Sequence, residues 1–318
     1  MPKRSSKLFY VACMVILFIV CIAAFGGILK PHGLTNEDKV LLFKKVIDGN
    51  MKFETPPYAP HSPYLLGSDH RGYDMLSLLL NGLKYTLVNA ALLTALRFIF
   101  ATPLGMWVGV TGNGSRVLRV MQWVISAVPA FLFLYPPLVG MFFGLGLNDV
   151  SKANPRDLML FTTVYYGMVT FLGIFPLAYQ MAERTRYYNR KIFVSASRLM
   201  GGSRLHRIVK HIHPNIRLEL LYMGISEFIA VLFLMGQLAI FNIIIGGSDT
   251  LVMVDKLAPG EVPYMIYLTT TGEWTSMIAY GAKYMKIYPH IVIESGIAFA
   301  LLILSLQFFL HQFKKRTQ

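Results

Sequence analysis

The sequence predicts an all-α integral membrane protein with about six transmembrane helices, from its composition, its apolar segments and its charge distribution. Apolar residues occupy 55% of the 318 positions and charged residues 14%, whereas about a quarter of the residues in a soluble domain are charged. The two cysteines, Cys13 and Cys21, share one apolar segment, so they indicate neither a disulfide framework nor a metal site. Since no linker or repeat interrupts the chain, we expect one integral domain.

Six apolar segments are long enough to cross a bilayer, because a helix rising 1.5 Å per residue needs about 20 residues to do so. They are 8–29, 84–110, 129–147, 158–179, 218–245 and 287–310. The first is longer than the apolar part of a signal peptide and lacks a clear cleavage site, so residues 1–29 should be a retained tail and span. The polar segment 30–83 should be extracytoplasmic, with a short surface helix at 69–82.

The basic residues favour one orientation. With both termini inside, the inner segments 1–7, 111–119, 183–217 and 311–318 hold 17 Lys and Arg and one acid, Glu183, while the outer segments hold 12 basic and 12 acidic residues. Cytoplasmic segments carry such an excess, so both termini should be cytoplasmic, with 311–318 a basic tail beside the membrane lipid. The net charge of +14 then needs no nucleic acid as a partner.

Three charged residues fall inside predicted spans: Arg97, Glu227 and Glu294. A charge in the bilayer is costly and faces protein or water. Two interpretations remain open, namely buried pairing that fixes helix packing and a lining of a solute path.

The segment 183–217 predicts a helix, a glycine turn, an amphipathic helix and a proline stop. Gly201 can end the first helix in a left-handed conformation, and Ser203 can cap the second. Apolar residues then recur at helical spacing, at Leu205, Ile208, Val209 and Ile212. Pro214 should end this helix. A helix lying on anionic lipid would also be basic, but it would need neither the paired glycines nor the Pro-Asn ending.

This segment, the EAA-like loop, resembles the loop of ABC importer permeases that reads Glu-Ala-Ala, three residues, Gly, and about a dozen residues to a Pro. The matching positions are Ala196, Arg198, Gly201, Ser203, Leu205, Ile208, His211, Ile212, Pro214 and Asn215. Two positions depart from the pattern, because Ser195 replaces the acid and Ser197 replaces the second Ala.

A second segment resembles the one preceding the second span in the C-type subunit of oligopeptide and dipeptide permeases. Its matching residues, the glycine-aspartate motif, are Gly67, Asp69, Gly72 and Asp74, with Tyr73 where the family has Arg. We expect this motif to be structural, with Asp69 capping the helix that follows. Glu273, Trp274 and Pro289 also match, so the resemblance runs from about 62 to 310.

The resemblance implies a type I ABC importer permease fold over 84–310, serving peptides, nickel or similar small solutes. It implies as partners a second permease subunit, one or two ATPase subunits and an extracytoplasmic solute-binding protein. The ATPase would bind the EAA-like loop through Ser195, Ala196, Ser197, Gly201, Ser203, Leu205, Ile208 and Pro214. The chain has no glycine-rich phosphate loop, so it should not itself hydrolyse ATP, and no catalytic, cofactor or metal residues are expected.

Two alternatives predict features that the sequence lacks. A single-chain secondary transporter predicts an inverted repeat with paired broken helices, and a membrane-embedded enzyme predicts convergent His, Asp and Glu on the spans. The acids within the spans are too sparse for the second, and no repeat supports the first.

Overall fold

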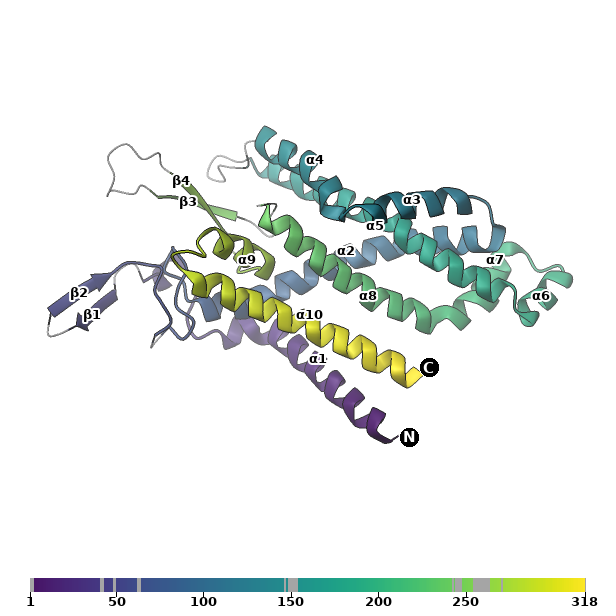
Figure 1. Cartoon of the computed structure of the whole chain (residues 1–318), viewed down its shortest axis with the longest axis horizontal. Helices are drawn as coiled ribbons and strands as arrows, with labels where there is room; N and C mark the ends of the chain where they lie inside the picture. The colour runs from purple at the N-terminus through teal and green to yellow at the C-terminus, as the bar shows by residue number, and fades with distance from the viewer. Residues whose placement is uncertain are drawn as a thin grey trace. The chain divides into compact units, whose positions relative to one another are not determined.

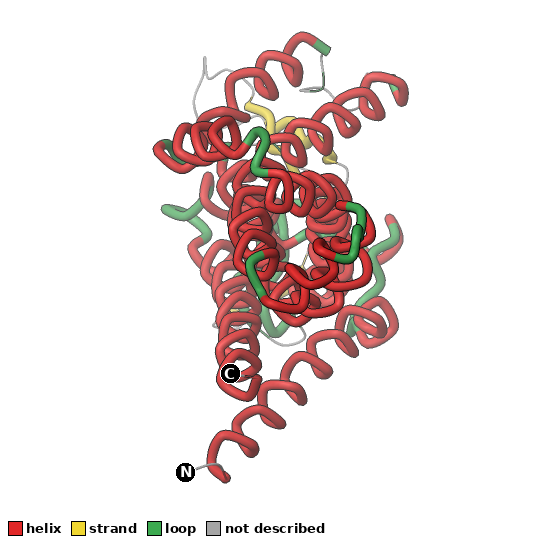
Figure 2. The backbone as a smooth tube through the Cα atoms, turned by 90° about the vertical axis from the view of Figure 1, so that its right-hand side faces the viewer, coloured by secondary structure: helices red, strands yellow, loops and turns green. Residues whose placement is uncertain are grey.

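The computed structural model describes residues 3–40, 43–47, 50–61, 64–145, 147, 154–241, 243, 248–253, 264–269 and 271–317. Helix dominates this part of the chain (Figure 2). The chain divides into two compact units. Unit 1 comprises Met1–Asn89, Phe142–Asp157 and Met235–Gln318, and unit 2 comprises Ala90–Met141 and Leu158–Leu234.

Unit 1 holds the two terminal helices, α1 (Lys3–Leu29) and α10 (Pro289–Thr317). They lie side by side (Figure 1), because the ring of Phe9 contacts those of Phe309 and Phe313, and the Arg316 guanidinium lies 4.4 Å from the Phe9 centroid. The first turns of α1 and the last turns of α10 therefore lie at the same end of unit 1.

The rest of unit 1 includes the first turns of α2 (Met75–Thr111), the last turns of α8 (His213–Ile240) and α9 (Trp274–Lys283). A 3₁₀ turn, Asn36–Asp38, follows α1. Two antiparallel hairpins pair β1 (Phe43–Ile47) with β2 (Asn50–Glu54) and β3 (Ser248–Met253) with β4 (Tyr264–Thr269). Phe43 is opposite Glu54 and Ser248 is opposite Thr269. The sequence analysis did not predict these strands, because they lack a clear apolar alternation.

Unit 2 contains the greater part of α2 and α8, together with α3 (Ser115–Ala127), α4 (Ala130–Gly144), α5 (Pro155–Asn189), α6 (Ile192–Leu199) and α7 (Arg204–His206). Small residues bring α2 and α5 together. A Cβ added to Gly105 would lie 2.6 Å from the Ala178 carbonyl oxygen, and one added to Gly109 would lie 2.5 Å from the Thr185 Cβ. Such close backbone approach is typical of helix pairs in membranes.

Within the described ranges, five helices are long and apolar enough to cross a membrane: Lys7–Leu29, Met75–Thr111, Pro155–Asn189, Arg204–Ile240 and Pro289–Arg316. The bent pair α3 and α4 makes up to six if it counts as one span. The predicted class, an all-α integral membrane protein, is therefore confirmed. The helices are longer than the apolar segments suggested. The 37 residues of α2 reach about 55 Å, against about 30 Å of hydrocarbon.

The predicted span 129–147 contains α4, which ends at Gly144. Before it, α3 meets α4 at a bend of 78° that the apolar pattern did not predict. The cause is Pro129, which disfavours helical backbone at the preceding residue, and Val128 is extended, with φ −129° and ψ 140°. The separate surface helix expected at 69–82 is absent, since α2 begins at Met75 and continues without a break.

Candidate functional site

The EAA-like loop forms a helix–turn–helix unit within unit 2, where α6 and α7 meet at the paired glycines (Figure 1). Gly201 has φ +84°, and its N–H donates to the Arg198 carbonyl at 3.2 Å. The N–H of Gly202 donates to the Ser197 carbonyl at 2.9 Å. These two bonds define a Schellman turn. The predicted left-handed glycine at the helix end is confirmed.

The predicted cap of the second helix is also confirmed, because the Ser203 hydroxyl accepts the His206 N–H at 3.2 Å. The predicted stop at Pro214 is wrong. From α7 the chain passes through a π-helical segment, Arg207–Ile212, and enters α8 without a break.

The π-helical segment explains how the helix tolerates its proline. The N–H of His213 bonds the carbonyl of Ile208, five residues back, so the turn before Pro214 is wider than an α-turn. The Asn215 side chain donates to the His211 carbonyl at 2.6 Å, which satisfies a group near the disrupted turn. Single π-turns of this kind let other groups enter a helix ladder.

The apolar face expected on this helix divides into a buried part and an exposed part. Ile208 is 8% exposed and Ile212 is fully buried, and both belong to a core cluster with Met106 of α2, Val194 of α6 and Ile216 of α8. Leu205, in contrast, is 64% exposed. Leu205 and Ile208, both named above as ATPase contacts, therefore differ in burial, and their contact with an ATPase stays a prediction.

The tip of the loop exposes three large apolar residues, Leu199 (89% exposed), Met200 (82%) and Leu205. They flank the Schellman turn in sequence, and we call them the apolar tip. Of the predicted loop residues, Ser197 and Ile208 are buried. The others are exposed, namely Ser195, Ala196, Gly201, Ser203, Leu205 and Pro214.

Two of the three predicted charges within spans form a buried ion pair in unit 2. Arg97 of α2 donates through Nη1 to Oε1 of Glu227 on α8. Its Nε and Nη2 also donate to the Val169 carbonyl of α5, at 3.2 and 2.8 Å. Gly173 provides the room, because a Cβ there would lie 2.2 Å from Arg97 Nε. The pair thus connects three helices, which favours the packing interpretation.

Glu294 behaves differently. It lies on α10 in unit 1 and is half-buried, and its Oε2 is buried with no hydrogen-bond partner in the described part of the chain. In the described part of the chain, this oxygen therefore has no hydrogen-bond partner that would fix helix packing as Arg97 does. Its assignment to packing or to a solute path stays a prediction.

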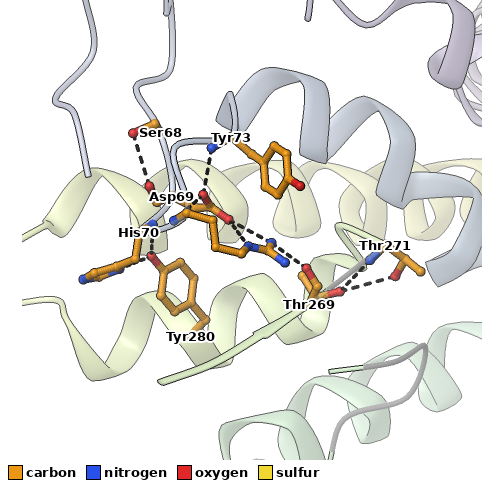
Figure 3. A network of polar contacts seen from close by, with 8 residues as sticks. Ser68, Asp69, His70, Tyr73, Thr269, Thr271 and Tyr280 are labelled. Carbon is orange, nitrogen blue, oxygen red and sulfur yellow. Dashed lines mark hydrogen bonds and ion pairs between the residues drawn. The ribbon is translucent and has the colours of Figure 1, made fainter. Parts of the chain in front are cut away.

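The glycine-aspartate motif forms a buried turn before α2. Asp69 Oδ1 accepts the N–H groups of Arg71 and Tyr73, each at 2.9 Å, and its Oδ2 pairs with the Arg71 side chain (Figure 3). The cap of α2 is Asp74, whose Oδ2 accepts the Ser77 N–H at 3.0 Å. The helix begins at Met75, one residue after Asp74, so the expectation that Asp69 caps it is wrong.

The two glycines of the motif occupy left-handed turns under tight backbone contact. Gly67 has φ +67° and Gly72 has φ +83°. A Cβ on Gly67 would lie 2.2 Å from the Tyr58 carbonyl oxygen, and one on Gly72 would lie 2.4 Å from that of Val40. Only glycine fits such positions without strain.

The motif is joined to α9 through His70. Its backbone N–H donates to the Tyr280 hydroxyl at 3.0 Å, and the same hydroxyl hydrogen-bonds the ring Nδ1 (Figure 3). The rings of Tyr284 and Tyr288 also contact the His70 ring. Burial lowers the pKa of His70 to about 4, with Asp69 opposing the shift, and burial raises the pKa of Tyr280.

Glu273 is a buried carboxylate whose role the sequence analysis missed. It caps α9 and accepts from the N–H and hydroxyl groups of Thr275 and Ser276, and Thr86 of α2 donates to its Oε1 at 2.9 Å. The sequence signal was an acid two and three residues before hydroxyl side chains, which is typical of a helix start. Glu273 therefore anchors α9 to α2 inside unit 1.

Metal-binding clusters and disulfides are the remaining features to consider among the described residues. Among them, no three His, Cys, Asp or Glu side chains gather as a metal site. Cys13 and Cys21 are free thiols.

Comparison with known proteins points to transport. No family model matches the chain. Two curated relatives are each named "Peptide transport system permease protein SapC", one from Escherichia coli O6:H1 and one from Shigella flexneri, and each is 26% identical over 205 residues. The match covers 63% of this chain and 59% of each relative. With the apolar helices, the likeness supports a multi-pass membrane protein.

Proposed function

We propose that the chain is a transmembrane permease subunit of an ATP-driven ABC importer with the type I fold. It forms half of the translocation path, and a second permease subunit forms the other half. An extracytoplasmic binding protein delivers the solute. The SapC relatives are named for peptide transport, and the glycine-aspartate motif matches that of peptide permeases, so peptides or similar small solutes are the proposed cargo.

This proposal rests mainly on the packing of the EAA-like loop. Its apolar tip is exposed, whereas the base beneath it is buried through Ile208 and Ile212 against Met106 and Ile216. Because packed interiors deform little, a force on the tip moves α2 and α8 as well. α8 continues from the loop to Ile240 without a break, so a partner ATPase that moves the tip would move a membrane helix.

The proposed orientation places this loop, together with both termini, in the cytoplasm. It follows from the 17 basic and one acidic residues of the inner segments and the positive-inside tendency. ATP is then bound and hydrolysed by partner subunits on the cytoplasmic side, and the chain itself takes part as a mechanical coupler.

A matched pair of variants tests the proposal. Leu205→Asp changes an exposed tip residue, so membrane abundance and thermal stability should stay near normal while ATPase co-purification and peptide uptake are lost. Ile208→Asp buries a charge in the core cluster and should cost more than about 2 kcal/mol of stability, with loss of abundance.

The measurements are membrane abundance, thermal stability, ATPase co-purification and uptake in the same cells. Retained ATPase and uptake in Leu205→Asp would remove the basis for docking at the tip. Gradient-driven uptake by the purified chain alone in vesicles would instead identify a secondary transporter.

A further inference from the structure

The EAA-like loop is strongly basic around its apolar tip. Between Tyr187 and Leu218 the sequence contains seven Lys and Arg and no Asp or Glu. The flanking acids are already engaged, since Glu183 pairs with Arg186 and Glu219 with Arg184. No carboxylate of the loop itself is left to balance the cations near the tip.

Three of these cations accompany the apolar tip. Arg198 precedes Leu199 and Arg204 precedes Leu205 in the sequence, and Lys210 follows one turn further on. All three side chains are exposed, and none has a carboxylate partner within the described residues. The loop therefore presents apolar side chains bordered by unneutralised positive charge.

The geometry favours a protein groove over a lipid surface as the occupant. A helix that lies on lipid immerses a continuous apolar stripe. Here the stripe residues Ile208 and Ile212 are buried inside the unit. The exposed apolar residues instead flank a Schellman turn between the short helix α6 and the start of the continuous helix Arg204–Ile240, a shape that fits a slot better than a plane.

We propose that the ATPase surface receiving this loop is an apolar slot with carboxylates on its rim, facing Arg198, Arg204 and Lys210. This inference rests on the proposed function and adds the chemistry of the partner. Complementary charge at the rim of an interface fixes the register of docking and excludes wrong partners. It would thus help to select the cognate ATPase.

Ser195 gives the inference a sharp test. It is exposed on α6, three residues before Arg198 and four after Lys191. A carboxylate at this position would lie beside both cations on the helix surface and partly neutralise them. Ser195→Glu restores the acid of the resembled loop, yet the acidic-rim proposal predicts that it weakens docking. Ser195→Gln is the matched uncharged control.

The experiment measures how much ATPase stays with the affinity-purified permease complex in nanodiscs as NaCl rises from about 0.05 to 0.5 M, a range over which exposed charges become screened. Wild-type and Ser195→Gln complexes should lose ATPase as salt rises. At low salt Ser195→Glu should retain about threefold less, with a flatter salt dependence and unchanged thermal stability.

Three outcomes separate the possibilities. Equal or better ATPase retention by Ser195→Glu overturns the acidic rim while the proposed function stands. Complete absence of ATPase from the wild-type complex at every salt concentration overturns the proposed function itself. Protection of the loop from trypsin by phosphatidylglycerol vesicles but not phosphatidylcholine vesicles, with salt-independent ATPase retention, overturns the inference in favour of lipid.

Discussion

The ion pair between Arg97 and Glu227 provides the most direct test of the packing interpretation. Their side chains are 6% and 15% exposed, and Arg97 also bonds the Val169 carbonyl. Arg97→Met keeps an unbranched apolar side chain at this position but removes the guanidinium with its charge and its donors. It therefore leaves Glu227 as a buried carboxylate without its cation.

Breaking a buried pair by removing one partner costs about 3–5 kcal/mol, whereas replacing both partners by apolar residues is often close to neutral. We therefore expect Arg97→Met to lower the free energy of unfolding by about 3–5 kcal/mol. The double variant Arg97→Met, Glu227→Leu should recover to within about 2 kcal/mol of the wild type. Such recovery is the signature of coupling between neighbouring residues.

The assay is denaturant unfolding of the purified protein in mixed micelles, with peptide uptake measured alongside. Thr94→Val on the same helix is the control, because the Thr94 hydroxyl bonds only its own helix at Ala90. If Arg97→Met abolished uptake at unchanged stability, the packing argument would be refuted and the solute path would be favoured.

Four further predictions concern the loop glycines, the buried histidine and the two aspartates of the glycine-aspartate motif. Gly201→Ala should cost about 1 kcal/mol for its left-handed backbone, whereas Gly202→Ala should cost more, since its Cβ would lie 2.7 Å from the Ser197 carbonyl; equal unfolding free energies would contradict this. Gly201→Arg should retain membrane abundance but lose uptake and ATPase, and normal uptake would oppose it. His70 is neutral when folded, because its pKa of about 4 lies below the ordinary 6.5. The unfolded chain therefore binds more protons between these values, and the free energy of unfolding should fall by about 2 kcal/mol from pH 7 to pH 5. The fall should be smaller in His70→Asn, and an equal fall in wild type and variant would contradict this prediction. Asp69→Ala should lower membrane abundance more than it changes solute selectivity. Asp74→Ala should do the same, because the lost helix cap costs about 1 kcal/mol of stability. Altered selectivity at full abundance would instead favour a role in solute contact.

Local features of the chain were predictable because they depend on neighbours in sequence. The membrane class followed from the length of the apolar segments, since each must satisfy its own backbone in lipid. The Gly201 turn and the Ser203 cap followed from backbone preferences within a few residues. The position of the bend between α3 and α4 was also encoded locally, by Pro129, although its angle was not.

The sequence by itself thus determined the membrane class, the apolar segments and the turn of the EAA-like loop. Only the tertiary structure decided which charges meet, so that Arg97 joins Glu227 across 130 positions. It likewise decided that Ile208 is buried while Leu205 is exposed, because α6 covers one side of the π-helical segment. The physical reason is that burial and ion pairing depend on segments distant in sequence, whereas turns and caps form from adjacent backbone groups.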